Sequence, residues 1–76
     1  MPTKAEQRVL ARIHVREAEL RVQNQATLIE MLRHDNYDSK LAEAMLSEYR
    51  KALEQSHARE REAESEQEET DADKLG

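Results

Sequence analysis

The stretch His34-Asp35-Asn36-Tyr37-Asp38-Ser39 decides the fold, because it is the one turn-like break between two long amphipathic patterns. Asparagine is, after glycine, the residue best suited to the left-handed conformation just past a helix C-terminus. Aspartate is a favoured N-cap residue for a helix that follows. We therefore predict a helix that ends at residue 34, a turn over residues 35–38 and a second helix from residue 39. So short a connection folds the second helix back antiparallel beside the first.

The composition supports an all-α fold. Among 76 residues there are one glycine, one proline and two tyrosines as the only aromatics, which excludes a sheet protein with several hairpins. Thr3 and Glu6 have the spacing of a capping box, so the first helix is predicted over residues 3–34. The second is predicted over residues 39–62. Together they form one antiparallel two-helix coiled-coil hairpin over residues 3–62.

Apolar residues alternate by three and four along both helices, which is typical of the face that packs against another helix. On the second helix we place this face at positions 42, 45, 49, 52 and 56, widened on one side by Leu46 and Leu53. The predicted hairpin seam consists of Val15, Val22, Ile29 and Leu32 from the first helix and Met45, Tyr49 and Leu53 from the second.

The first helix carries a second apolar stripe, displaced by about half a turn from the seam. Isolated exposed aliphatic residues are normal on protein surfaces, so the stripe need not be an interface. However, an apolar content of 37% is thin for a conventional core, and one partner helix cannot cover both faces. We therefore predict self-association, most simply a homodimer of hairpins that forms a four-helix bundle. The predicted interface residues are Val9, Ile13, Leu20 and Met31.

The charge is distributed unevenly. Residues 60–73 hold eight acidic residues and one base, Arg61. Like charges four residues apart destabilise a helix, so we expect residues 63–76 to form a disordered acidic tail. In the antiparallel hairpin the acidic segment lies beside basic residues at the start of the first helix, either as solvated surfaces or as ion pairs. The ion pairs considered are Glu60 with Arg12, Glu64 with Arg8 and Glu68 with Lys4.

The sequence shows no constellation of catalytic or ligand-binding residues. Without cysteine, disulfides, thiolate catalysis and cysteine-ligated metals are excluded. We find no glycine-rich phosphate loop and no nucleophile with a matching base, so we expect no enzyme activity, no catalytic residue and no cofactor. His14 and His57 lie at the edges of the apolar stripes and are interpreted as boundary residues rather than metal ligands.

Nucleic-acid binding and membrane association are not expected either. The basic run over residues 4–16 is the one candidate for phosphate contacts, and it lies beside the acidic segment. No stretch approaches 18 uncharged apolar residues, and no secretory pattern precedes the first helix. We expect a cytoplasmic chain.

Residues 28–57 resemble a group of short, uncharacterised bacterial helical-hairpin proteins. The likeness rests on Leu28-Ile29-Glu30-Met31-Leu32, on Asp35-Asn36-Tyr37-Asp38-Ser39 and on the run from Leu41 to Leu53. Members of that group commonly read Gly-His-Asp-Thr where this chain has Asn36-Tyr37-Asp38-Ser39. The resemblance implies a bacterial helical hairpin and provides no activity to transfer.

In size and topology the chain is also similar to the small helical-hairpin phosphatases that act on sporulation response regulators. Their Ser-x-x-x-Asp motif on the second helix is missing, because Ser47 is followed four residues later by Lys51. Our leading hypothesis is a non-enzymatic interaction module that self-associates and presents a helical surface to a cytoplasmic protein. The alternatives are an accessory that binds a response regulator without catalysis, and a nucleic-acid-associated protein.

Overall fold

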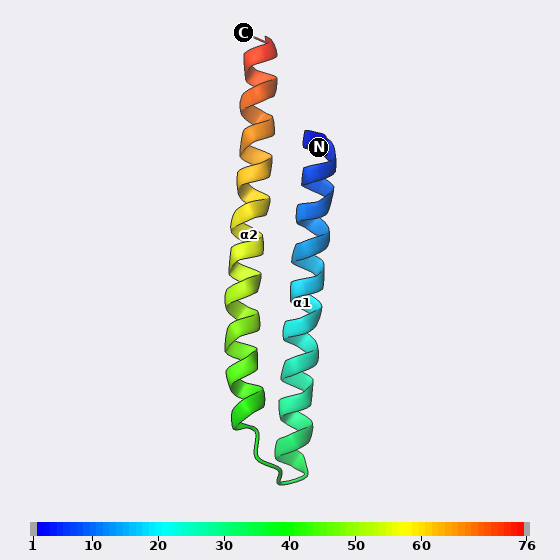
Figure 1. Cartoon of the computed structure of the whole chain (residues 1–76), viewed down its shortest axis with the longest axis vertical. Helices are drawn as coiled ribbons and strands as arrows, with labels where there is room; N and C mark the ends of the chain where they lie inside the picture. Colours follow the sequence, from blue (N-terminus) through cyan, green and yellow to red (C-terminus); the bar gives the residue numbers. More distant parts are fainter. Residues whose placement is uncertain (1, 76) are drawn as a thin grey trace.

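The chain folds into two long helices that lie side by side and run antiparallel (Figure 1). The computed structural model describes the backbone of residues 2–75 and the side chains of residues 2–65. Helix α1 spans Lys4–His34 and helix α2 spans Lys40–Leu75. The described residues contain no strand, and the hairpin measures 62 × 18 × 15 Å. The predicted all-α antiparallel hairpin is confirmed.

Thr3 caps the N-terminus of α1. Its backbone is extended, and its side-chain oxygen accepts a hydrogen bond from the Glu6 amide at 3.1 Å. The return contact differs from the predicted capping box: the Glu6 carboxylate accepts from the Thr3 hydroxyl at 3.2 Å. One amide that would otherwise lack a partner in the first turn is thereby satisfied, which typically stabilises a helix by about 0.5–2 kcal/mol.

The turn ends α1 with a Schellman motif. Asn36 has a φ of 62°. Among the residues that the structure describes, it is the one non-glycine residue with a positive φ. The Tyr37 amide donates to the Leu32 carbonyl at 2.8 Å, and the Asn36 amide donates to the Arg33 carbonyl at 3.1 Å. These two bonds satisfy carbonyls that the helix end leaves unpaired. Asparagine therefore occupies the left-handed position for which the sequence selects it.

Helix α2 begins at Lys40, one residue later than predicted. The Ser39 carbonyl accepts the first helical bond from the Glu43 amide at 2.8 Å, so Ser39 is the N-cap residue. Asp38 still contributes, because its carboxylate accepts from the Lys40 amide at 3.0 Å. The prediction of Asp38 as the N-cap is therefore wrong by one residue, although its side chain does accept a hydrogen bond from the first turn of α2.

Helix α2 continues past the predicted end at residue 62 to Leu75. The expected disorder of the acidic tail over residues 63–76 stays a prediction, because the side chains from residue 66 on lie outside the described part of the chain. The prediction counted repulsion between glutamates and neglected two favourable effects. Glutamate, arginine, glutamine and alanine all have high helix propensity. In addition, Ala63 and Glu64 are half-buried, so α2 still faces α1 at this point.

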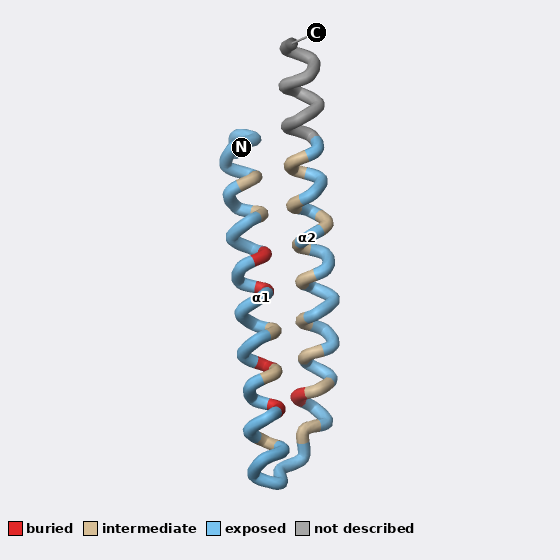
Figure 2. The backbone as a smooth tube through the Cα atoms, turned by 180° about the vertical axis from the view of Figure 1, so that it is seen from behind, coloured by how far each residue is buried: buried red, intermediate tan, exposed pale blue. Residues whose placement is uncertain are grey.

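A single seam joins the two helices. Buried and half-buried residues alternate by three and four along each helix, as in coiled coils (Figure 2). From α1 the series is Arg8, Ala11, Val15, Ala18, Val22, Gln25, Ile29 and Leu32; from α2 it is Ala42, Leu46, Tyr49, Leu53, Ser56, Glu60 and Ala63.

The seam on α2 differs from the prediction at Met45. This side chain is 40% exposed, whereas the neighbouring Leu46 is half-buried. Ala52 is likewise exposed, and the adjacent Leu53 is half-buried. The structure thus takes the alternative phase of the same pattern, in which the two bulkier leucines face α1 and more apolar area is removed from water.

Candidate interaction surface

The core of the hairpin is small. Four apolar residues are buried, namely Val15, Ala18, Ile29 and Ala42, and two of these are alanines. None of the described side chains is fully buried. Of the other predicted seam residues, Val22, Leu32, Tyr49 and Leu53 are half-buried. Water therefore still reaches most of the apolar side chains between the two helices.

A buried glutamine lies in the middle of this core. Gln25 is 8% exposed, and its side-chain amide donates to the Ala42 carbonyl at 2.9 Å. Because a buried amide without a partner is costly, this bond accounts for a polar residue in the seam. It also connects α1 directly to the first turn of α2.

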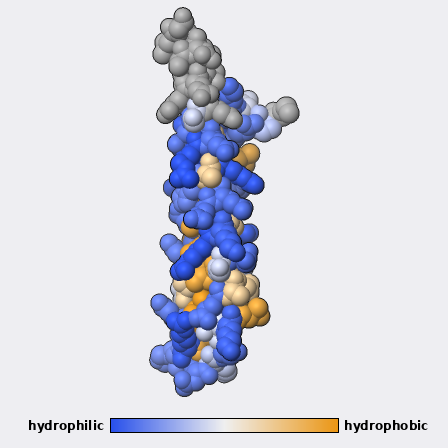
Figure 3. Space-filling model, turned by 90° about the vertical axis from the view of Figure 1, so that its left-hand side faces the viewer, coloured by the Kyte–Doolittle hydropathy of each residue, from blue (hydrophilic) through white to orange (hydrophobic). Residues whose placement is uncertain are grey.

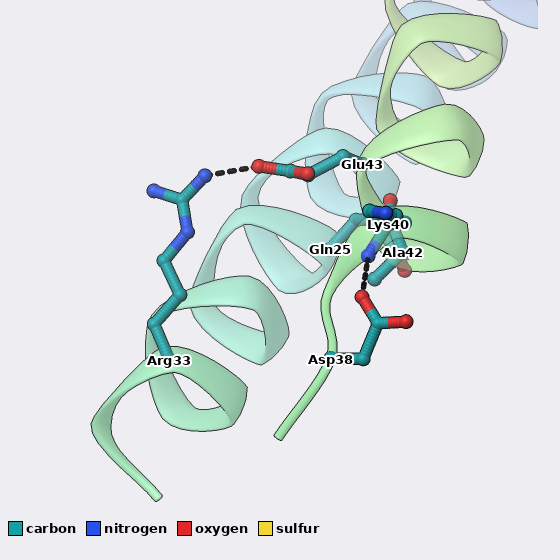
Figure 4. Close-up of polar contacts among 6 residues, drawn as sticks. All are labelled: Gln25, Arg33, Asp38, Lys40, Ala42 and Glu43. Carbon is teal, nitrogen blue, oxygen red and sulfur yellow. Dashed lines mark hydrogen bonds and ion pairs between the residues drawn. The ribbon is translucent and has the colours of Figure 1, made fainter. Parts of the chain in front are cut away.

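Pairs of polar and charged side chains join the two helices along one side of the seam. Arg33 on α1 pairs with Glu43 on α2 beside the turn (Figure 4). Further along the same two helices, His57 lies 4.0 Å from Glu19. An open groove of about 850 Å³ lies between the helices here, and Arg33, Glu43 and His57 are among its lining residues. Exposed ion pairs of this kind contribute little stability. The groove is also lined by Ile29, Leu46 and Leu53, so apolar side chains are accessible on this side too.

The two histidines weighed as metal ligands lie on different grooves of the hairpin. His14 lines a different groove of about 330 Å³ that also includes Arg59, whereas His57 lines the groove with Glu43. Within the side chains that the structure describes, no three histidine, cysteine or acidic residues are grouped as a metal site would need.

The outer face of α1 carries the predicted second stripe, and all four of its predicted interface residues are exposed. The exposed fractions are 54% for Val9, 43% for Ile13, 56% for Leu20 and 61% for Met31. Leu10, which is 45% exposed, was missed; it lies between this face and the seam, because it also lines the groove of about 330 Å³ with Ala11 and Ser56. Its spacing of three residues from Ile13 was the available signal. We call Val9, Ile13, Leu20 and Met31 the α1 outer stripe.

Helix α2 differs from α1 on its outer side. Its exposed large apolar residues are Leu41 and Met45, both in its first two turns. Seen from the α2 side, the surface is mostly hydrophilic, and its largest apolar area lies toward the turn (Figure 3). Leu28 and Tyr37 add exposed apolar surface near this end of the molecule. Among the described residues, α1 is therefore the helix whose exposed apolar side chains recur from its first turns to its last, with polar residues between them.

The acidic segment contacts α1 at the seam rather than only at the surface. Glu60 is half-buried at a seam position, and it forms no ion pair with Arg12 among the described residues. The predicted pair of Glu68 and Lys4 lies outside the described side chains.

Comparison of the chain with family models, with curated proteins and with solved structures finds no significant match. The resemblance to bacterial hairpin proteins stays a prediction. Over the described residues, neither helix has a segment both long and apolar enough to pass through a bilayer.

Proposed function

We propose that the chain is a non-enzymatic protein–protein interaction module that self-associates through the α1 outer stripe. The observation that carries this proposal is the imbalance between buried and exposed apolar side chains. Among the described side chains, nine large hydrophobic residues are at least 40% exposed, while Val15 and Ile29 are the two buried apolar residues larger than alanine. Small domains with so little core generally need an additional source of stability; a chain without cysteine cannot obtain it from disulfides, and association is a common alternative.

The arrangement of the exposed residues favours a helix as the binding surface. Ile13 and Leu20 are seven residues apart, and Val9 and Met31 extend the same line. Such spacing presents one apolar stripe to a partner helix, interrupted by the polar residues Glu17, Asn24 and Thr27. A second copy provides a helix with a matching stripe at equal concentration, so a symmetric homodimer satisfies both copies at once.

The test is the molar mass in solution across a hundredfold dilution, with a double variant that charges the stripe. Ile13→Glu with Leu20→Glu places two carboxylates in the proposed interface. We expect the unaltered chain to have twice its mass of 8.9 kDa and the variant to be a monomer with reduced helicity. We expect the variant to lose the dimer because an unpaired carboxylate is costly to bury in an apolar interface.

A matched control introduces the same change in charge on the other helix. Ala44 and Gln55 are exposed on α2, so Ala44→Glu with Gln55→Glu should remain dimeric. A dimer that survives the α1 variant would reject the assignment of the face. An unaltered chain that is monomeric and melts cooperatively at every concentration would reject self-association itself.

A further inference from the structure

The α1 outer stripe lies directly opposite the seam. Ile13 is two residues from each of the seam positions Ala11 and Val15, and Leu20 is two residues from Ala18 and Val22. Two residues along an α-helix correspond to a rotation of about 200°. Both side chains therefore leave α1 on the side that faces away from α2.

This geometry determines how a second hairpin can be placed. A helix in a compact four-helix bundle contacts its two neighbours on faces about 90° apart. The two apolar faces of α1 are about 180° apart. A partner that covers the outer stripe therefore leaves α1 between α2 and the partner helix. The four helices then lie in one layer, with both α2 helices at the edges.

The charges beside the stripe disfavour a parallel arrangement of the two α1 helices. In a parallel pair each residue faces its own copy, so Glu17, within the stripe, would meet Glu17 of the partner. Arg16 and Arg21 flank the stripe on its two sides, and each would approach the other arginine across a parallel interface, as flanking positions of parallel coiled coils do. A parallel pair gains one polar contact, between the two copies of Asn24.

An antiparallel arrangement removes most of these conflicts. With the twofold axis between the two α1 helices at the level of Val22, Ile13 faces Met31 of the partner, so these two apolar side chains cover each other. In the same register Leu20 faces Asn24 of the partner. Arg16 then lies near Glu30 of the partner, and symmetry provides this opposite-charge pair twice. Glu17 faces Thr27 of the partner, whose hydroxyl can donate a hydrogen bond. Arg21 alone approaches its own copy.

We propose that the dimer is an antiparallel layer of four helices, ordered α2, α1, α1 and α2, in which Ile13 of each chain packs against Met31 of the other. This inference rests on the proposed function and specifies its partner, its contact and its direction. It replaces the compact four-helix bundle that the sequence led us to expect. Helix α2 then remains accessible along its outer side in the assembly.

Disulfide cross-linking tests the direction, because the chain has no cysteine of its own. Chains carrying Ile13→Cys and chains carrying Met31→Cys are refolded together and oxidised. A disulfide requires Cα atoms about 4.4–6.8 Å apart, so only facing positions link efficiently. We expect the mixture to yield several-fold more linked dimer than either variant alone, with one chain of each kind in the product. Efficient linking of Ile13→Cys to itself would overturn the proposal in favour of a parallel pair.

A distance measurement tests the layer without altering the interface. Spin labels are attached at Lys51→Cys, which is exposed on α2. In the layer the two α2 axes are three helix spacings apart, about 24–30 Å, whereas in a compact bundle they are about 8–14 Å apart. The longer distance supports the layer and the shorter one overturns it. A dimer by molar mass that gives the short distance rejects this inference alone, and a monomer rejects the proposed function as well.

Discussion

The two ends of the hairpin are packed differently. Near the turn, Ile29 and Ala42 are 5% and 7% exposed, and Gln25 bonds across the seam beside them. Toward the open end, Val15 is the last buried residue. Beyond it the seam consists of half-buried residues that are small or charged, namely Arg8, Ala11, Ser56, Glu60 and Ala63. The comparison teaches that buried contacts extend from the turn as far as Val15, and that beyond Val15 the hairpin depends more on helix propensity.

Charged seam residues have a physical use at the open end. The aliphatic stems of arginine and glutamate can cover neighbouring alanines while their charged groups stay in water. This provides contact between the helices without a dry core, and such regions open at low free-energy cost. We therefore expect substitutions at the turn end to have large effects and equivalent substitutions at the open end to have small ones.

The largest effect is expected at Ile29. Ile29→Ala removes most of the larger buried side chain beside the turn, which should lower the free energy of unfolding by about 2–5 kcal/mol. Ser56→Ala changes a half-buried seam residue at the open end and should shift the free energy of unfolding by no more than about 0.5 kcal/mol. Urea unfolding followed by circular dichroism, at equal protein concentration, measures both. Equal losses at the two positions would break the comparison between the ends.

Two substitutions of Gln25 distinguish the contribution of its hydrogen bond from the contribution of its packing at the turn end. Gln25→Ala loses both the bond to the Ala42 carbonyl and side-chain volume, and should cost about 1–3 kcal/mol. Gln25→Leu keeps the volume and removes a buried polar group, so its stability should equal or exceed that of the unaltered chain. Thermal unfolding of the two variants checks this order. A loss for leucine as large as that for alanine would show that the hydrogen bond dominates.

Asn36 tests the turn itself. With a φ of 62°, a β-branched residue is strained here, so Asn36→Val should destabilise the hairpin by about 1–2 kcal/mol. Asn36→Gly adopts the same conformation freely and should stay within a few tenths of a kcal/mol of the unaltered chain. Denaturation midpoints of the pair check the prediction. An unaffected valine variant would mean that the turn rearranges and contributes little to the closed end.

Local chemistry explains what could be predicted from the sequence. Asn36, Asp38 and Thr3 act on backbone groups within a few residues, so the sequence alone indicates where α1 begins and ends. The phase of α2 could not be decided in this way. Met45 and Leu46 both continue an alternating pattern that starts at Ala42, and only contact with α1 selects Leu46.

The end of α2 could not be predicted from local sequence effects alone. Repulsion among glutamates is a local effect, and counted alone it places the end of the helix at residue 62. The contribution of α1, which leaves Glu60 and Ala63 half-buried, is not local. The α1 outer stripe was predictable because its residues keep their helical spacing whether or not a partner is present.

The smallest expected effect is at the ion pair of Arg33 and Glu43, which joins the helices beside the turn. The two side chains are 63% and 42% exposed, so their coupling should be about 0.2–1 kcal/mol and should fall as salt is added. A double-mutant cycle with Arg33→Ala and Glu43→Ala measures it. The pair of Lys51 and Glu48, 3.3 Å apart within α2, is the control for a contact that does not join the helices. A coupling at Arg33 and Glu43 well above 1 kcal/mol would mean that charge, rather than the buried Ile29 and Ala42, holds the turn end closed.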